Sequence, residues 1–383
     1  MIYLDNAATT YPKPISVLKN INNSIIKFGA NPGRSGHKMS LATADELFKC
    51  REVTKKLFNA SSEENILFTC NCTYALNTVI KGYLKPGDHV VVSNLEHNAV
   101  MRPLQKLKAK DIINFSIAKI YCEDNDKTID SFRKSITDKT TLIICTHASN
   151  VWGIKTPIER LTFLAKEYEI PILVDAAQTA GVVPIDLQDT PIDFLCTAGH
   201  KGLYGPMGTG LLITKKGDLV DTLVEGGTGT DSLSFEQPSY MPDKFESGTP
   251  NTPGIIGLRS GIEFILRKGI KNISKHEFSL IQYAYDELSK IDKVKLYFNK
   301  PNDKYFVPLI SFNIDDKNSE DVAAYLDQMG IATRAGLHCA PSAHKYKDTV
   351  KSGAVRVCPS IFNNFNHIDR LIYCIKRFVK TQL

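Results

Sequence analysis

Short apolar runs rich in β-branched residues alternate with amphipathic stretches through the first two thirds of the chain. Such runs predict buried β-strands near residues 66–68, 90–92, 142–145, 172–174 and 211–214. The turn Pro86-Gly87-Asp88 leads directly into one of them, which is typical of a helix–turn–strand junction. Regular alternation of strands and helices predicts a mostly parallel sheet with helices on both faces.

Two of the amphipathic stretches carry helix signals. Ser40 is a candidate N-cap for a helix that runs to about Phe58, and Pro157 suits the first turn of a second helix that ends near Glu169. The apolar positions of the first helix recur at helical spacing, at Leu41, Ala44, Leu47, Phe48 and Leu57.

The pattern changes after residue 225. Residues 225–253 are rich in Gly, Thr, Ser and Pro and predict long irregular loops, and residues 254–267 then predict a long helix that would link two domains. From about residue 294 the pattern is α+β. It predicts strands near 296–298 and 309–313, a helix over 319–328 and a closing helix after 366.

Composition and charge exclude several classes of protein. The 383 residues suffice for two or three domains, and 43% hydrophobic with 23% charged residues is ordinary for a soluble globular protein. The net charge is only +6. The basic stretches 106–110 and 370–380 are interrupted by apolar residues at helical spacing, so they predict solvated helix faces and no nucleic-acid site.

The sequence also favours a cytoplasmic protein. No apolar run approaches the roughly 20 residues that span a bilayer, and residues 1–5 do not resemble the start of a secretory signal. The nine cysteines include no C-x-x-C pair, and the isolated Cys70-x-Cys72 lacks a second pair to complete a metal site. We therefore expect reduced thiols, no membrane contact and no bound metal.

Two polar residues stand out in apolar or glycine-rich surroundings. Asp175 follows the run 172–174, where the carboxyl end of a parallel strand would face a ligand crevice; taken alone, it is more often a helix N-cap. Lys201 lies in the sparsely charged segment Gly199-His200-Lys201-Gly202. Desolvation there would lower its pKa and free it for Schiff-base chemistry, although taken alone it fits an ordinary surface lysine.

The combination of these residues favours a cofactor site. The segment Asn71-Cys72-Thr73 is placed where a helix N-terminus can bind a phosphate. A Schiff-base lysine, an acid for a cationic ring nitrogen and an anion-binding helix terminus are together what a pyridoxal 5′-phosphate site needs.

At these positions the chain resembles the cysteine desulfurases of the class V aminotransferases, which are pyridoxal phosphate enzymes of fold type I. The resemblance runs from residues 3–10 to residues 356–360. Seven ordered motifs carry it: 31–37 (NPGRSGH), 96–97 (EH), 147–153 (HASNVWG), 175–178 (DAAQ), 199–201 (GHK), 245–251 (FESGTPN) and 334–339 (RAGLHC).

The resemblance implies an α/β fold of the aspartate aminotransferase type. Residues 15–255 would form the large cofactor domain with its mostly parallel sheet. Residues 1–14 and 256–383 would form a smaller α+β domain that carries the loop of the catalytic cysteine. A homodimer is also implied, with the active site at the subunit interface.

The resemblance assigns roles to matching residues around the cofactor ring. Lys201 would bind the cofactor covalently, and Asp175 would keep the pyridine nitrogen protonated. Gln178 would bind the ring hydroxyl. His97 would stack on the ring and serve as an acid–base group.

Further residues would bind the phosphate and the substrate. The phosphate would be bound by Cys72, Thr73 and His200, and Thr249 would reach the phosphate of the partner subunit's cofactor. Arg356 would clamp the substrate carboxylate with a bidentate fork. The remaining substrate-binding residues would be Asn150, His37 and Arg334.

Cys339 lies in a Gly- and Pro-bounded loop with cations on its N-terminal side. Nearby positive charge favours a thiolate, whereas most of the other eight cysteines lie in apolar strand or helix patterns. The short Arg-x-Gly-x-His-Cys loop resembles that of the SUF-like and selenocysteine lyase-like group. Cys339 would then be the nucleophile that accepts sulfur as a persulfide.

The sequence departs from the family pattern at three places. Ala198 stands where the family usually has a Ser or Thr that binds phosphate, and Thr197 or backbone amides could replace that contact. Gly202 is an additional glycine after the lysine, and residues 225–230 differ from the SUF-type loop. We therefore expect a side branch of the family.

The favoured function is conversion of L-cysteine to L-alanine, with the sulfur passed from Cys339 to a protein acceptor for iron–sulfur clusters, thio-cofactors or tRNA thiolation. Selenocysteine lyase activity on L-selenocysteine remains an alternative, as does another class V reaction such as transamination or epimerisation. A cofactor-binding scaffold without turnover is disfavoured by the joint presence of Lys201, Asp175, His97 and Arg356.

Overall fold

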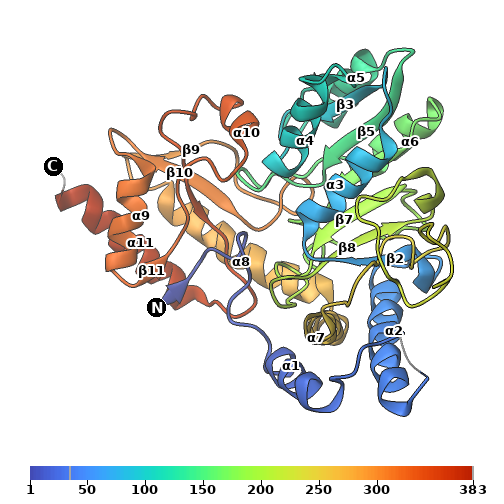
Figure 1. Cartoon of the computed structure of the whole chain (residues 1–383). Helices are drawn as coiled ribbons and strands as arrows, with labels where there is room; N and C mark the ends of the chain where they lie inside the picture. The colour runs from blue at the N-terminus through green and yellow to red at the C-terminus, as the bar shows by residue number, and fades with distance from the viewer. Residues whose placement is uncertain (34–35, 382–383) are drawn as a thin grey trace.

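Seven strands form the central sheet of the computed structural model, which describes residues 1–33 and 36–381 (Figure 1). Arg34 and Ser35 of the first predicted motif therefore lie outside the described residues. In spatial order the strands are β2 (Ile66–Thr69), β8 (Gly210–Thr214), β7 (Phe194–Ala198), β6 (Ile172–Asp175), β5 (Thr140–Thr146), β3 (His89–Ser93) and β4 (Asn114–Ala118). Strand β8 runs opposite to the other six strands, which are parallel to one another, and this confirms the predicted mostly parallel sheet.

Side chains that alternate along each strand fill two apolar cores, one on each face of the sheet. In β3, for example, Val91 belongs to one core, and Val90 and Val92 belong to the other. Helices α3 (Cys72–Tyr83) and α4 (Asn98–Lys108) cover one face. The other face is covered by α2 (Lys38–Phe58), α5 (Asn125–Ser135), α6 (Ile158–Glu167) and α7 (Thr252–Lys268). Because both faces are buried, most strands appear in the sequence as continuous apolar runs.

The N-cap of α2 is His37, so the prediction that Ser40 caps this helix was wrong. The Nδ1 atom of His37 accepts a hydrogen bond from Ser40 N (3.2 Å). The Ser40 hydroxyl instead donates to the carbonyl oxygen of Asn31 (2.8 Å). The serine therefore lies inside the first turn and ties the preceding loop to the helix.

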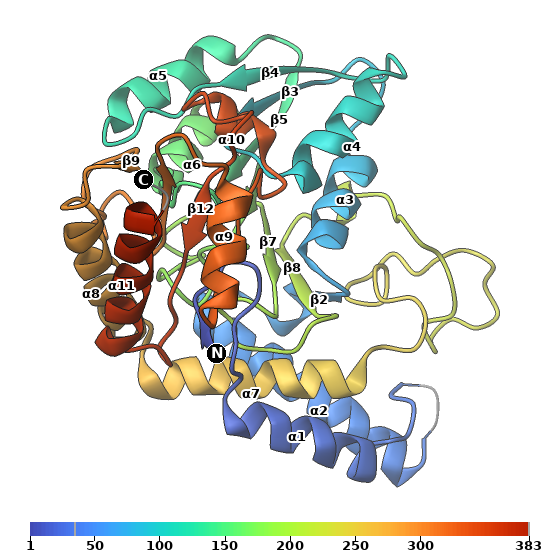
Figure 2. The same cartoon turned by 90° about the vertical axis from the view of Figure 1, so that its left-hand side faces the viewer.

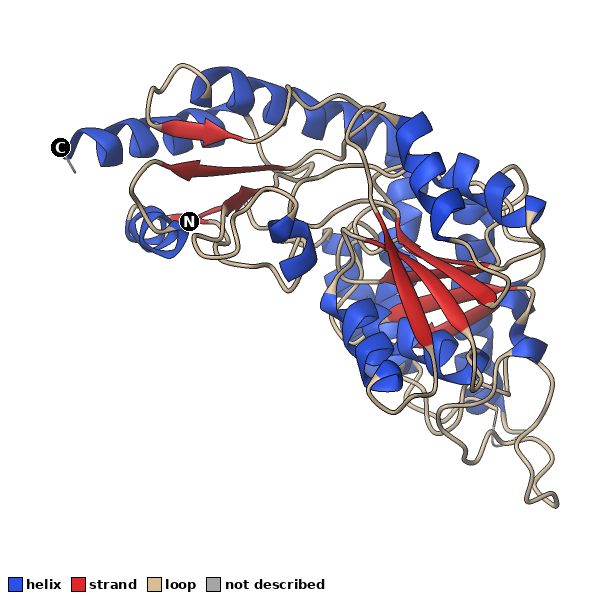
Figure 3. Cartoon of the chain, turned by 90° about the horizontal axis from the view of Figure 1, so that it is seen from above, coloured by secondary structure: helices blue, strands red, loops and turns tan. Residues whose placement is uncertain are grey.

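A second group of elements lies beside the central sheet (Figure 3). Strands β12 (Val355–Val357), β10 (Ile310–Ile314) and β9 (Val294–Leu296) form an antiparallel sheet, and β1 (Ile2–Tyr3) pairs with β11 (Ile331–Ala332). A third core joins them to helices α8 (Ile270–Leu288), α9 (Ser319–Gln328) and α11 (Phe365–Thr381). The N-terminal strand thus packs with the C-terminal third of the chain.

Helix α7 packs against α1 (Ile15–Lys27) and α2 (Figure 2). Its residues Ile255, Leu258 and Ile262 belong to a core of the central sheet. The predicted division of the chain at residue 255 stays a prediction. Residues 225–251 contain neither helix nor strand, as predicted, whereas Thr252 and Pro253 already belong to α7; the loop exposes Leu233 and Phe235 completely. In the described part of the chain, no helix is both long and apolar enough to cross a membrane.

Candidate active site

The strand order reverses between β3 and β5, because the chain places β4 on one side of β3 and β5 on the other. In open parallel sheets, ligands bind at the carboxyl ends of the strands beside such a reversal. A cavity of about 200 Å³ lies at this edge. Its walls include eight of the residues predicted for the site: Cys72, Thr73, His97, Asn150, Asp175, Gln178, His200 and Lys201.

Asp175 ends strand β6 and is 5% exposed. Its Oδ1 atom accepts hydrogen bonds from Ala177 N (2.9 Å) and from the thiol of Cys72 (3.4 Å). Burial, followed by the nearby Asp175 carboxylate, raises the pKa of Cys72 well above its usual value. Cys72 therefore stays a neutral thiol that can donate to Asp175 and orient it.

Lys201 follows strand β7, and its backbone is fixed from two sides. Its carbonyl oxygen accepts from the hydroxyl of Thr10 (2.8 Å) and from the backbone N–H of Tyr204 (2.9 Å). Burial lowers the pKa of the Lys201 amine, while the carboxylate of Asp175 opposes this shift. A lowered pKa increases the neutral fraction that can attack a carbonyl carbon.

Gly202 has a packing role that explains one departure from the family pattern. A Cβ atom at this position would lie 2.4 Å from the carbonyl oxygen of Ala180 and 2.9 Å from a methyl group of Val182. The glycine therefore allows the lysine loop to approach the segment that follows Gln178.

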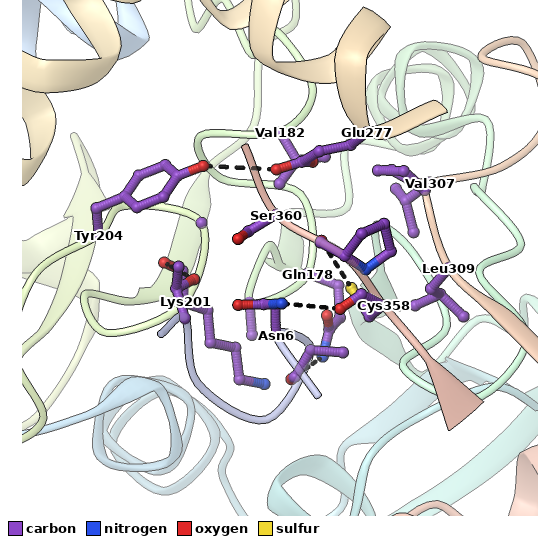
Figure 4. A pocket seen from close by; sticks show the side chains of 16 residues that line it. Asn6, Gln178, Val182, Lys201, Tyr204, Glu277, Val307, Leu309, Cys358 and Ser360 are labelled. Atoms are coloured by element: carbon purple, nitrogen blue, oxygen red, sulfur yellow. Dashed lines mark hydrogen bonds between the residues drawn. The ribbon is translucent and has the colours of Figure 1, made fainter. Parts of the chain in front are cut away.

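On its other side, Lys201 borders a second cavity of about 30 Å³ (Figure 4). The carboxyl group of Glu277, on α8, lies at its wall and is 4% exposed. Burial raises the pKa of Glu277 to about 8. The Tyr204 hydroxyl donates to Glu277 Oε1 at 3.5 Å. A largely neutral carboxylic acid therefore lies behind the lysine loop at pH 7.

Two histidines of the cavity are neutral at pH 7. His97 is the N-cap of α4, its Nδ1 atom accepts from Ala99 N (3.0 Å), and burial lowers its pKa. This hydrogen bond leaves the proton on Nε2. Burial, assisted by the charge of Lys201, lowers the pKa of His200 to about 4, and its buried Nδ1 atom has no partner among the described residues.

Thr197 does not replace the hydroxyl that is missing at Ala198. The two residues alternate along β7, so Ala198 lines the cavity while the Thr197 hydroxyl is directed to the carbonyl oxygen of Ala176 (3.4 Å). At this end of the cavity, α3 begins with Cys72 and Thr73 and presents its N-terminus. A helix N-terminus offers backbone N–H groups to an anion.

Arg356 lies on β12 and is 1% exposed. Its Nη2 atom pairs with Asp5 Oδ1 (2.7 Å), its Nη1 atom donates to the carbonyl oxygen of Asn150 (2.8 Å), and its buried Nε has no partner among the described residues. The sequence prediction missed the role of Asp5. The sequence did contain a signal for this role, because Asp5 is the acidic residue of the N-terminal motif 3–10. It lies far along the chain from Arg356, which it orients.

The loop that carries Cys339 is attached by its backbone to the mouth of the cavity. The carbonyl oxygen of Cys339 accepts from Asn98 N (2.8 Å), and that of His338 accepts from the amide of Asn150 (2.7 Å). His338 and Cys339 both adopt the left-handed conformation, with φ of 51° and 56°. Such backbone geometry is uncommon outside glycine and often occurs at functional sites.

The thiol of Cys339 is exposed, and the Nη2 atom of Arg334 lies 3.8 Å from its sulfur. Arg334 thus contacts the predicted nucleophile directly. Neither residue lines the 200 Å³ cavity itself. The loop therefore places an accessible sulfur atom beside the mouth of the cavity.

His37 and Thr249 are exposed and do not line the cavity. Each makes a local hydrogen bond: His37 caps α2, and the hydroxyl of Thr249 accepts from the amide of Asn31 (3.2 Å). Their predicted roles in binding substrate and the partner's cofactor stay predictions.

Glu96 is a further buried carboxyl beside the cavity. Its Oε1 atom accepts from the hydroxyl of Ser93 and from Thr146 N (2.7 Å), and its Oε2 atom has no partner among the described residues. Burial raises its pKa to about 8. Glu96 thereby connects the loop that bears His97 to strand β5.

Comparison with known proteins defines the class of protein. The sequence model of the aminotransferase class-V family matches residues 2–371, so the chain belongs to this family. A relative from Borreliella burgdorferi, named probable cysteine desulfurase, is 34% identical over 393 residues, which cover 99% of this chain and 92% of the relative. A relative of the same name from Methanothermobacter thermautotrophicus is 33% identical and covers 97% and 92%.

Solved structures agree with this assignment. The apo structure of a cysteine desulfurase from Thermococcus onnurineus has a TM-score of 0.91 at 30% identity and covers 99% of this chain and 95% of that one. The cysteine desulfurase CsdA from Escherichia coli gives 0.88 at 27% identity, with 99% and 94% covered. The predicted family and fold type are confirmed.

Proposed function

We propose that this chain is a pyridoxal phosphate–dependent cysteine desulfurase that converts L-cysteine to L-alanine and retains the sulfur as a persulfide on Cys339. One observation carries the proposal. Cys339 has an exposed thiol with the guanidinium of Arg334 at 3.8 Å, and its carbonyl oxygen accepts from Asn98 N, next to His97 in the wall of the cavity that contains Lys201 and Asp175. The names of the relatives support the same activity.

The residues of the cavity fit pyridoxal phosphate. Lys201, whose pKa is lowered, would hold it covalently, and the buried Asp175 would pair with its ring nitrogen. His200, with its unpartnered Nδ1, and Thr73 at the N-terminus of α3 would hold the phosphate. When bound, the cofactor supplies an electron sink for the substrate Cα.

Gln178, His97 and Arg356 would complete the site. The Gln178 amide, which donates to the carbonyl oxygen of Ala7 (3.0 Å), has an acceptor oxygen left for the ring hydroxyl. His97 is neutral and carries a proton on Nε2, so it can donate to the substrate. The buried guanidinium of Arg356 would bind the substrate carboxylate beside Asn150.

The sulfur step needs a nucleophile within bonding distance of the substrate sulfur. The Cys339 thiolate attacks that sulfur and forms the S–S bond of the persulfide. The substrate C–S bond breaks, and its electron pair stays on the carbon atom, which takes up a proton to give alanine. Arg334 stabilises the attacking thiolate.

A homodimer is part of the proposal. Large apolar side chains are exposed on α1 and α2 and on the long loop before α7, including Ile26, Leu41 and Phe235. Clustered exposed apolar residues are typical of subunit interfaces. His37 is the N-cap of α2 and Thr249 lies on the loop before α7, so both belong to these elements, and a partner interface there could bring them to the partner's cavity. The nine cysteines are free thiols, which supports a reducing, cytoplasmic location.

The proposal is tested with purified protein, L-cysteine or L-selenocysteine, and measurements of alanine and of the mass of the Cys339 peptide. Wild type should release alanine and, without reductant, gain one sulfur on that peptide. Cys339→Ala should lose nearly all alanine release from L-cysteine, whereas Cys70→Ala, at the other exposed cysteine, should keep it. Full cysteine activity in Cys339→Ala, without a persulfide in wild type, would instead favour a transaminase-like or selenium-specific enzyme.

A further inference from the structure

A groove opens beside the cofactor cavity, between α3 and α4, which lie side by side (Figure 2). It has a volume of about 330 Å³. Residues spaced four apart, which share one helical face, line it from both helices: Thr73, Asn77 and Lys81 on α3, and Asn98, Arg102 and Lys106 on α4, where Ala99 and Pro103 line it as well.

The groove is positively charged. Lys81, Arg102 and Lys106 are exposed, and none of the described residues that line the groove is acidic. Among the ion pairs of the described residues, none includes any of these three cations. The charge of Arg102 also contributes to the lowered pKa of His97. These cations are therefore available to an acidic partner.

The inner end of the groove is the place where sulfur would be stored. Cys339 lines the groove, and its carbonyl oxygen accepts from Asn98 N at the start of α4 (2.8 Å). Thr73 and His97 line both the groove and the cofactor cavity. The groove thus connects the predicted nucleophile with a cationic surface that leads away from the cavity.

We propose that this groove docks an acidic segment of the protein that accepts the sulfur, with the acceptor thiol held at Cys339. The inference rests on the proposed function. From Thr73 to Lys81 the helix rises about 12 Å at 1.5 Å per residue, which matches roughly four residues of extended chain. A small thiol at Cys339 would not reach the cations at the outer end, so the groove fits a peptide segment.

The transfer step is balanced without an external oxidant or reductant. The acceptor thiolate attacks the outer sulfur of the Cys339 persulfide. The S–S bond breaks, Cys339 leaves as a thiolate, and the acceptor becomes a persulfide. Acidic residues beside the acceptor cysteine would pair with the groove cations and increase the rate of productive encounter.

The test uses persulfide-loaded enzyme and two synthetic peptides of equal length, each with one cysteine. The cysteine is flanked by Asp and Glu in one peptide and by Asn and Gln in the other. Sulfur on each peptide is measured by mass spectrometry at low and high salt. Each transfer rate is divided by the rate of alanine release with dithiothreitol as the reductant, which measures turnover without a peptide acceptor. At low salt, the acidic peptide should accept sulfur about tenfold faster, and the difference should shrink at high salt.

Two double glutamate variants with the same change in net charge, one in the groove and one outside it, separate docking in the groove from a general effect of net charge on sulfur transfer. Lys81→Glu/Lys106→Glu should remove the preference for the acidic peptide, and Lys81→Gln/Lys106→Gln should reduce it partly. Lys134→Glu/Lys166→Glu, at exposed positions on α5 and α6, should retain it. Equal transfer to both peptides, or equal loss in both glutamate variants, would overturn the docking site. Absence of a persulfide on Cys339 would instead overturn the proposed function itself.

Discussion

Two parts of the active site are built in opposite ways. Asp175 ends one central strand and Lys201 follows the adjacent one, and burial lowers the pKa of the lysine. Cys339 stands on a loop with left-handed backbone geometry, exposed and in contact with one guanidinium. The buried part suits acid–base chemistry, which needs fixed distances and little water. The exposed part suits a sulfur atom that must meet both a substrate and a second protein.

Loss of the buried lysine should have the largest effect. Lys201→Ala removes the only amine that lines the cavity among the described residues, so alanine release should fall at least about a thousandfold. Borohydride reduction of wild type should label Lys201, as read by peptide mapping. Lys13 is a strict control, because burial also lowers its pKa, to about 8, and its amine donates to His200 O (2.6 Å). A label on Lys13 would contradict the assignment.

Asp175→Asn preserves shape and removes the charge that would pair with the cofactor nitrogen. We expect about a hundredfold loss of turnover with the fold retained, because the ring then takes up electrons less readily. Turnover and visible absorption are compared with those of Asp189→Asn, at an exposed position. Turnover within about threefold of wild type, roughly 0.7 kcal/mol in barrier, would refute the role of Asp175.

On the exposed side, Arg334→Gln removes the guanidinium beside Cys339. The rate at which iodoacetamide alkylates Cys339 without substrate should fall about fivefold, roughly 1 kcal/mol, because a surface charge pair is partly screened. Arg334→Lys keeps the charge and should restore most of the rate. If the glutamine and lysine variants react equally, Arg334 acts on the substrate and not on the thiol.

Glu277→Gln tests the protonation state of the buried carboxyl behind Lys201, through the pH dependence of the free energy of unfolding. Folding raises the pKa of Glu277 from 4.5 to about 8, so the folded state retains a proton that the unfolded state has lost between these values. The free energy of unfolding should therefore fall as pH rises through this window, and fall less in the glutamine variant. Urea unfolding at pH 5.5 and 8.5 should show a difference of about 2 kcal/mol between the two proteins. Parallel pH profiles would refute a neutral Glu277.

The surroundings of Asp175, Lys201 and residues 71–73 indicated a site at the carboxyl edge of a parallel sheet, and the resemblance to the family indicated the other residues of the cavity. It did not predict the partner of Arg356, because Asp5 lies 351 positions away and is brought near only by the pairing of the two ends of the chain. Strands β4 and β7 were not among the predicted apolar runs; β4 lies at the edge of the sheet and exposes Ile117, so it lacks the continuous apolar pattern of a buried strand. The proposed replacement by Thr197 failed because neighbours in a strand point to opposite faces.

The wall shared by the cavity and the groove has a kinetic consequence. Thr73 and His97 line both the cofactor cavity and the groove, so the substrate and the acceptor segment approach Cys339 through one shared opening. Alanine must depart before an acceptor segment can occupy that opening. The catalytic cycle is then a ping-pong reaction, in which the enzyme alternates between a thiol form and a persulfide form. Double-reciprocal plots against L-cysteine should then be parallel at different acceptor concentrations, and excess acceptor should compete with L-cysteine for the empty thiol form.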